Sequence, residues 1–172
     1  VYGMIHGIEG FLQDKLVDLD KYLADPMGIE LLKRTPSAFL GSCRFKMPKI
    51  EGHEDVYENV FKIMEEHDID TLFYAGGNDS MDTVKMLSDY AKEHGKKELF
   101  MGVPKTIDND LPVTDHCPGY GSAAKYIATT MKEVIRDNES FGAAKPTIVI
   151  AEIMGRDAGW LTAAAALAKG DD

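Results

Sequence analysis

The feature that most constrains the fold of this 172-residue chain is a strand–helix–strand pattern in its middle. Residues 71–75 (TLFYA) and 98–103 (ELFMGV) are short apolar runs typical of strands. Between them, one helical face repeats apolar residues up to a terminating glycine: Met81, Val84, Leu87, Ala91 and then Gly95. A helix joining consecutive strands favours parallel pairing with right-handed crossovers. We therefore predict an α/β fold of parallel sheets with helices on both faces, three-layered and Rossmann-like.

The rest of the chain continues the alternation. The pattern predicts a short strand over residues 1–6, a helix over 54–67 and a long helix from about Gly121. The β-branched run 147–153 (TIVIAEI) predicts a buried strand. A last helix is expected over 159–170.

Composition excludes several classes of function. The formal net charge is −10 and the pI about 4.9, which argues against nucleic-acid binding because that needs a basic surface. The sequence has neither an 18-residue apolar run nor a visible signal peptide, so we expect no membrane association. Cys43 and Cys117 are expected to be ordinary thiols in a reducing cytoplasm. The strand-like opening at Val1 suggests a piece of a longer protein.

Ligands of parallel α/β sheets bind beyond the carboxyl ends of the strands, which singles out three loops. The first is residues 76–80 (GGNDS). Gly76 and Gly77 allow backbone amides to approach a phosphate, and a helix N-capped by Ser80 would point its dipole there. The alternative is a plain strand–helix turn.

The second loop is residues 104–110 (PKTIDND). In an extended segment Asp108 and Asp110 would project on one side, as Mg²⁺ ligands or as a base beside a metal-binding acid. Thr106 offers a hydroxyl and Lys105 a charge for phosphate. The alternative is a solvated acidic loop.

The third loop is residues 154–157 (MGRD), where Gly155 permits close approach and Arg156 could fork onto a phosphate. A structural pair between Arg156 and Asp157 is the alternative. Phosphoryl transfer needs phosphate-binding amides, a metal, a base and cations. The three loops together contain candidates for all four.

Several motifs resemble those of the phosphofructokinases over the whole chain. They are PKTIDND, GGNDS, GFL, FLGSCRF and MGRDAGW. The resemblance implies phosphofructokinase-like parallel sheets, and within the family the chain looks like the pyrophosphate-dependent branch. ATP-using members generally have glycine at the place of Asp79 and usually at that of Lys105. A carboxylate at residue 79 would fill the room of the nucleotide α-phosphate and repel it.

The resemblance also implies roles for single residues. Asp108 would be the catalytic base, Lys105 would stabilise the transferred phosphoryl group, and Asp79 would set the donor. The sugar phosphate would be bound by Thr106, Ile107, Asp108, Met154, Gly155 and Arg156. The donor phosphates would be bound by Gly76, Gly77, Ser80 and Arg44. Mg²⁺ would be held by Asn78 and Asp110, although Asn78 stands where the family usually has Asp.

On this resemblance we expect residues 1–121 to form a phosphoryl-donor domain lacking its first phosphate loop. Residues 122–172 would begin an incomplete sugar-phosphate domain. The implied substrates are pyrophosphate and fructose 6-phosphate, and the implied assembly is a homo-oligomer, either dimer or tetramer. Two alternatives remain: the same reaction with ATP, and a non-catalytic subunit or fragment that binds sugar phosphate.

Overall fold

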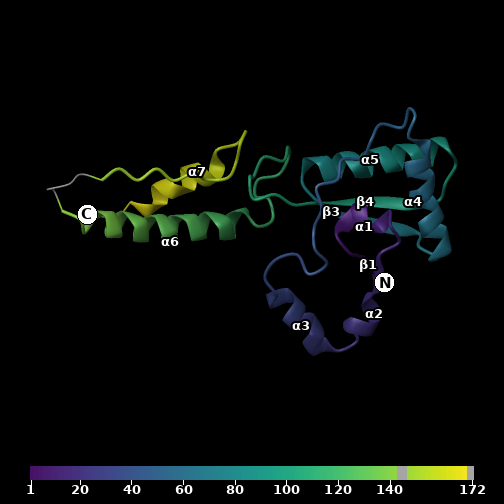
Figure 1. Ribbon diagram of the computed structural model, residues 1–172, viewed down its shortest axis with the longest axis horizontal. Helices are drawn as coiled ribbons and strands as arrows, with labels where there is room; N and C mark the ends of the chain where they lie inside the picture. The colour runs from purple at the N-terminus through teal and green to yellow at the C-terminus, as the bar shows by residue number, and fades with distance from the viewer. Residues whose placement is uncertain (143–146, 170–172) are drawn as a thin grey trace. The chain divides into compact units, whose positions relative to one another are not determined.

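The computed structural model describes residues 1–142 and 147–169, and the chain divides into two compact units. Unit 1 comprises Val1–Tyr74 and Asp79–Val103, and unit 2 comprises Ala75–Asn78 and Pro104–Asp172. Figure 1 labels their helices and strands. The predicted functional division near residue 121 therefore differs from this structural division, and it stays a prediction.

Unit 1 begins with a small antiparallel sheet. Strand β1 (Tyr2–Met4) pairs with β2 (Leu16–Asp18), so that Gly3 lies opposite Val17. The short helix α1 (Gly7–Phe11) connects them. Two helices follow, α2 (Leu19–Tyr22) and α3 (Pro26–Arg34), and the side chains of Asp18 and Asp25 cap them. Asp is a favoured N-cap because its carboxylate accepts a bond from an unpaired helical N–H.

The predicted strand–helix–strand unit is present. It consists of β3 (Thr71–Gly76), α5 (Asn78–Glu93) and β4 (Leu99–Pro104). The amide of Leu99 donates to the Asp70 carbonyl, and that of Lys105 donates to Gly76. Because the partners advance together along the chain, β3 and β4 are parallel, and the predicted α/β class is confirmed.

The core of unit 1 lies between this sheet and its helices. The helix α4 (Glu54–Glu66) contributes Tyr57, Phe61 and Met64 to the core, and Figure 1 shows α5 running alongside β4. The rings of Phe61 and Phe100 meet edge to face, with their centroids 5.6 Å apart. The opposite face of the sheet stays exposed and apolar, with Phe73, Leu99, Met101 and Val103.

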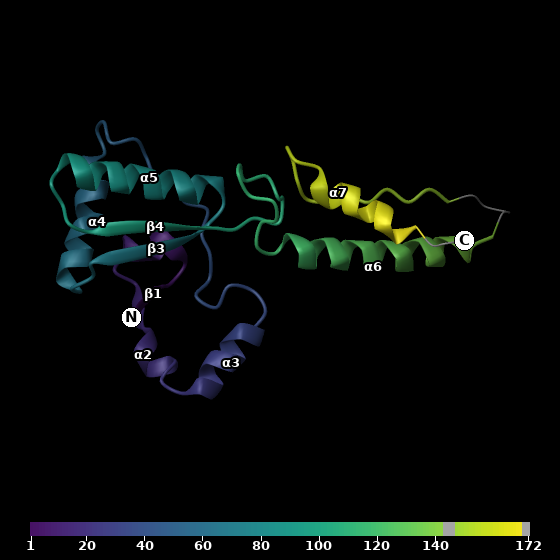
Figure 2. The same ribbon diagram turned by 180° about the vertical axis from the view of Figure 1, so that it is seen from behind.

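Unit 2 contains one long helix and a short helical segment packed along it. They are α6 (Tyr120–Glu139), α7 (Trp160–Ala164) and the 3₁₀ turn η1 (Ala165–Ala168), which lie side by side in Figure 2. Leu161, Ala164 and Ala168 are buried there. Of the predicted last helix over 159–170, residues 160–168 are helical, first as α7 and then as the 3₁₀ turn η1. Among the helices of the described residues, none has the length and apolar character to cross a membrane.

The predicted buried strand at 147–153 is wrong. This segment forms no strand, and Ile148 and Ile150 are 86% and 91% exposed. A strand needs a neighbour that takes up its backbone hydrogen bonds. Within the described part of the chain, the only paired strands are β1 with β2 and β3 with β4, so nothing provides that neighbour.

Candidate active site

The first predicted loop joins β3 directly to α5. Gly76 is buried at the end of β3, and α5 begins at Asn78. The prediction that Ser80 caps this helix is therefore wrong. Asp79 lies in the first turn, where a carboxylate interacts favourably with the positive end of the helix, and this favours the earlier start.

Ser80 instead interacts with strand β3 of unit 1. Burial raises the pKa of the Tyr74 hydroxyl, the nearby Cys43 thiol raises it further, and a side-chain hydrogen bond with Ser80 lowers it. The role of Ser80 in binding a donor phosphate stays a prediction.

In unit 2 the first two loops lie next to each other. The Lys105 amide donates to the Gly76 carbonyl at 2.8 Å. A Cβ added to Gly77 would lie 3.7 Å from the Lys105 carbonyl oxygen. The backbone of Lys105 is therefore fixed beside the two glycines, while its side chain is exposed.

The second loop presents Asp108 with an unpartnered oxygen. Asp108 Oδ1 is buried and has no hydrogen-bond partner. The backbone amide of Asp108 donates to Thr106 Oγ1 at 3.1 Å, so this hydroxyl can still donate its own proton to a ligand. Buried oxygens are normally paired, so this one is suited to receive a substrate hydroxyl.

Asn109 shapes this loop, and sequence reasoning missed it. Its backbone is left-handed, with φ of 57°, so the predicted extended conformation from Asp108 to Asp110 is wrong. Its Oδ1 accepts from the Cys117 amide at 2.7 Å, and its Nδ2 donates to the Asp115 carbonyl at 3.3 Å. An Asn between two acids was the available signal, because Asn tolerates this conformation.

The third loop lies beside Asp108. Gly155 has φ of 124°, and a Cβ there would lie 4.0 Å from Asp108 Oδ1 and 3.6 Å from the Gly159 amide nitrogen. Arg156 Nε donates to Asp157 Oδ2 at 3.0 Å, which is the pair that the sequence left as an alternative. Met154 is 63% exposed. Ile107 is half-buried and lies against Gly119, where an added Cβ would be 3.2 Å from its Cγ2.

In unit 1, two exposed cations lie in the segment before Met47. Arg44 is exposed, and its role in binding the donor phosphates stays a prediction. Lys46, which the sequence reasoning missed, places its Nζ 3.8 Å from Asp79 Oδ1. Asp79, which the sequence predicts to set the donor, is therefore paired with a cation.

The predicted magnesium ligands Asn78 and Asp110 both belong to unit 2 and are exposed. Residues 1–142 and 147–169 contain no group of three or more His, Cys, Asp or Glu that could hold a metal. Mg²⁺ in phosphoryl-transfer sites is usually bound by one or two carboxylates plus substrate phosphates. Metal binding by Asn78 and Asp110 therefore stays a prediction.

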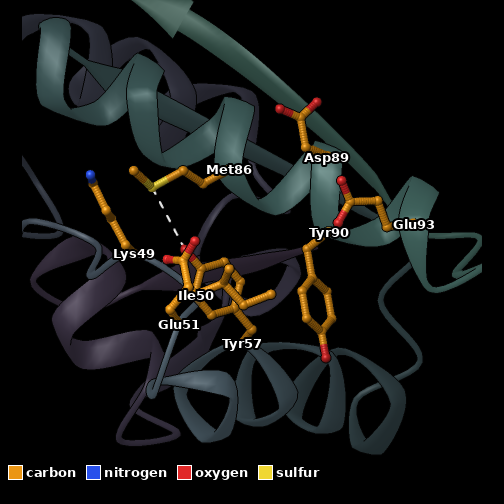
Figure 3. Close-up of a pocket in the computed structure, with 8 residues that line it drawn as sticks. All are labelled: Lys49, Ile50, Glu51, Tyr57, Met86, Asp89, Tyr90 and Glu93. Carbon is orange, nitrogen blue, oxygen red and sulfur yellow. Dashed lines mark hydrogen bonds between the residues drawn. The ribbon is translucent and has the colours of Figure 1, made fainter.

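A cavity of about 350 Å³ in unit 1 is separate from these residues (Figure 3). Its lining is Lys49, Ile50, Glu51, Tyr57, Met86, Asp89, Tyr90 and Glu93. The Tyr57 hydroxyl donates to the Pro48 carbonyl at 2.7 Å, and its oxygen also lies 3.6 Å from the Met86 sulfur. Three carboxylates against one lysine would repel a phosphate, so we do not assign the donor to this cavity.

The whole chain, residues 1–172, matches the sequence model of the family described as Phosphofructokinase. The chain therefore belongs to the phosphofructokinase family. Two similar curated relatives are named pyrophosphate–fructose 6-phosphate 1-phosphotransferase. The protein from Methylococcus capsulatus is 42% identical over 98% of this chain and 40% of its own length. That from Xanthomonas campestris is 45% identical over 95% and 38%.

A solved structure agrees with this. The pyrophosphate-dependent phosphofructokinase of Nitrosospira multiformis matches with a TM-score of 0.89 and 40% identity, over 99% of this chain and 41% of that one. A relative from Actinobacillus succinogenes, named ATP-dependent 6-phosphofructokinase, is 35% identical over 99% of this chain and 48% of its own. The chain thus spans about two fifths of the length of its pyrophosphate-dependent relatives.

Proposed function

We propose that the whole protein transfers a phosphoryl group from pyrophosphate to the 1-hydroxyl of fructose 6-phosphate, giving fructose 1,6-bisphosphate in a reversible reaction. The names of the relatives at 41–45% identity support this choice of substrates. The chain by itself is expected to be inactive, because it spans only part of such an enzyme.

The observation that carries the proposal is the Asp108 carboxylate. Its buried Oδ1 lacks a partner and lies beside Gly155, within a loop that the Asn109 side chain holds in shape. A general base must be within hydrogen-bond reach of the proton that it accepts. In our proposal Asp108 accepts the proton of the sugar 1-hydroxyl, while Thr106 and Ile107 position the sugar on the same loop.

The neighbouring loop would bind the sugar phosphate through Met154, Gly155 and Arg156. Gly155 supports this role because it has no Cβ, so a ligand can approach its backbone closely. Its φ of 124° is one that residues with a side chain rarely adopt. The guanidinium of Arg156 would bind the phosphate. Asp157 would orient that guanidinium, because Arg156 Nε donates to Asp157 Oδ2 at 3.0 Å.

Pyrophosphate is proposed as the donor because of two residues. Asp79 is exposed in the first turn of α5, at the place of a family glycine, and would exclude a nucleotide. The backbone amide of Lys105 donates to the Gly76 carbonyl. The ammonium group of Lys105 would offset the negative charge that develops on the transferred phosphoryl group. Gly76, Gly77, Ser80 and Arg44 would hold the remaining phosphate oxygens.

Mg²⁺ is proposed as the cofactor, held by Asn78 and Asp110 together with donor oxygens. Bound there, it would neutralise charge on the donor phosphates. Asn78 is a neutral ligand, so Asp110 would supply most of the protein's negative charge toward the metal.

The test is an activity assay of the full-length protein with pyrophosphate and ATP compared side by side. We expect turnover with pyrophosphate and a much lower kcat/KM with ATP. A preference for ATP would instead support an ATP-dependent 6-phosphofructokinase. Sugar-phosphate binding without turnover from either donor would support a non-catalytic subunit. The mass of the protein in solution tests the predicted dimer or tetramer.

A further inference from the structure

We propose that Lys46 is a specificity-determining residue of the donor site. Its ammonium group neutralises the Asp79 carboxylate, so that residue 79 can exclude a nucleotide by its bulk without repelling pyrophosphate by its charge. This inference rests on the proposed function, and it concerns only residues of unit 1.

In the segment that carries Lys46, side chains that pack against the core alternate with exposed ones. Cys43, Phe45 and Met47 pack against or within the hydrophobic core of unit 1. The residues between them, Arg44 and Lys46, are exposed. An alternation with a period of two places both cations on the outward side of the same segment.

The direct contact lies on that outward side. Lys46 Nζ is 3.8 Å from Asp79 Oδ1, and their side chains are 80% and 68% exposed. An exposed ion pair at this distance adds little to folding stability. We therefore expect the ion pair to act on ligand binding, by changing the electrostatic potential at a bound pyrophosphate.

Asp79 presents an electrostatic difficulty for the proposed function. Its carboxylate stands at the start of α5, where the helix dipole and nearby amides favour an anion. A carboxylate there repels every polyphosphate, including the intended donor, and this repulsion grows as the ligand displaces water. The Lys46 ammonium cancels most of that charge, while the volume of the Asp79 side chain remains.

The test is a double-mutant cycle in the full-length protein, with Lys46→Met, Asp79→Asn and the two combined. Asp79→Asn removes the charge and keeps the shape. With Asp79 present, Lys46→Met should raise KM for pyrophosphate about 10-fold, because the carboxylate is left uncompensated. In the Asp79→Asn background the same change should raise KM less than about 3-fold. The kcat and the KM for fructose 6-phosphate should stay within about 2-fold.

Two further variants make the result specific. Lys46→Arg keeps the positive charge and should preserve KM for pyrophosphate. Lys49→Met removes another exposed lysine, which lines the cavity of Figure 3, and it should leave KM unchanged. Unchanged thermal unfolding of all variants would show that the fold is intact.

The outcomes separate this inference from the proposed function. If the unmodified protein does not use pyrophosphate, the proposed function fails. If it does, but Lys46→Met has no effect, or has an equal effect in the parent and in the Asp79→Asn background, Lys46 does not act through Asp79. A rise in KM that Lys46→Arg also produces would overturn the inference in the same way.

Discussion

Asp108 gives the sharpest prediction at the scale of single residues. Asp108→Asn in the full-length protein should lower kcat by about 10²–10⁴, the range typical of losing a general base. KM for fructose 6-phosphate should change far less, because the side chain keeps its shape. Steady-state kinetics with pyrophosphate would measure both constants.

A nearby acid provides the control for this variant. Asp115 is exposed, and only its backbone carbonyl takes part in the loop, so Asp115→Asn should keep full activity. The Tm of Asp108→Asn should be no lower than that of the parent, since Asp108 Oδ1 makes no hydrogen bond that could be lost. Near-normal kcat in Asp108→Asn would remove this residue from the mechanism.

We also predict that single residues set the choice of donor. Asp79→Gly should raise kcat/KM for ATP, because it removes the side-chain bulk that occupies the room of the α-phosphate. Lys105→Gly should depress kcat with pyrophosphate more than it raises KM, because the lysine acts where charge develops. Measuring kcat/KM for both donors in the parent, both single variants and the double variant tests the assignment. ATP use that stays unchanged in Asp79→Gly would contradict it.

The loop 104–119 is an element whose shape depends on one side chain. Asn109→Gly keeps the left-handed backbone but removes the bond that Asn109 Oδ1 accepts from the Cys117 amide. We expect faster hydrogen exchange at that amide and a lower kcat, since Asp108 loses its support. Asn109→Ala should be worse, because a Cβ in this conformation costs about 1–2 kcal/mol. Hydrogen exchange at the Cys117 amide that is as slow as in the parent would show that the Asn109 side chain does not hold this loop in shape.

Two helical glycines should respond in opposite ways to alanine. At Gly10 in α1 an added Cβ would lie 1.6 Å from the Ile5 carbonyl oxygen, so Gly10→Ala should cost at least about 3 kcal/mol. At Gly121 in α6 nothing lies within 4 Å, and Gly121→Ala should stabilise by about 0.5–1 kcal/mol. Thermal unfolding of the two variants compares them. A Gly10→Ala variant as stable as the parent would show that α1 is packed differently.

Local sequence pattern predicted the elements whose packing partners are close in the chain. The parallel unit around α5 was predicted because β3, α5 and β4 bury their apolar faces against one another. Pattern failed at 147–153, because β-branched content reports a preference for strands but not whether a neighbour exists. It also missed Asn109 and Lys46, whose partners Cys117 and Asp79 are eight and thirty-three residues away.

At the scale of the whole molecule, the exposed run Ile148–Ile150 yields the last prediction. These β-branched side chains are 47–91% exposed in a chain that spans about two fifths of its relatives' length. We expect further segments of the full-length protein to cover these apolar side chains and to take up the backbone hydrogen bonds of the run. Hydrogen exchange there should be on the order of 10² slower in the full-length protein than in the isolated 172-residue chain.

An internal reference makes this comparison sharp. The Leu99 amide already donates to the Asp70 carbonyl within unit 1, so it should be protected in both proteins. Protection at 148–153 only in the full-length protein would show that residues beyond this chain supply the missing neighbour. Fast exchange in both would mean that the run stays uncovered, since the backbone amides would then have found no partner in either context.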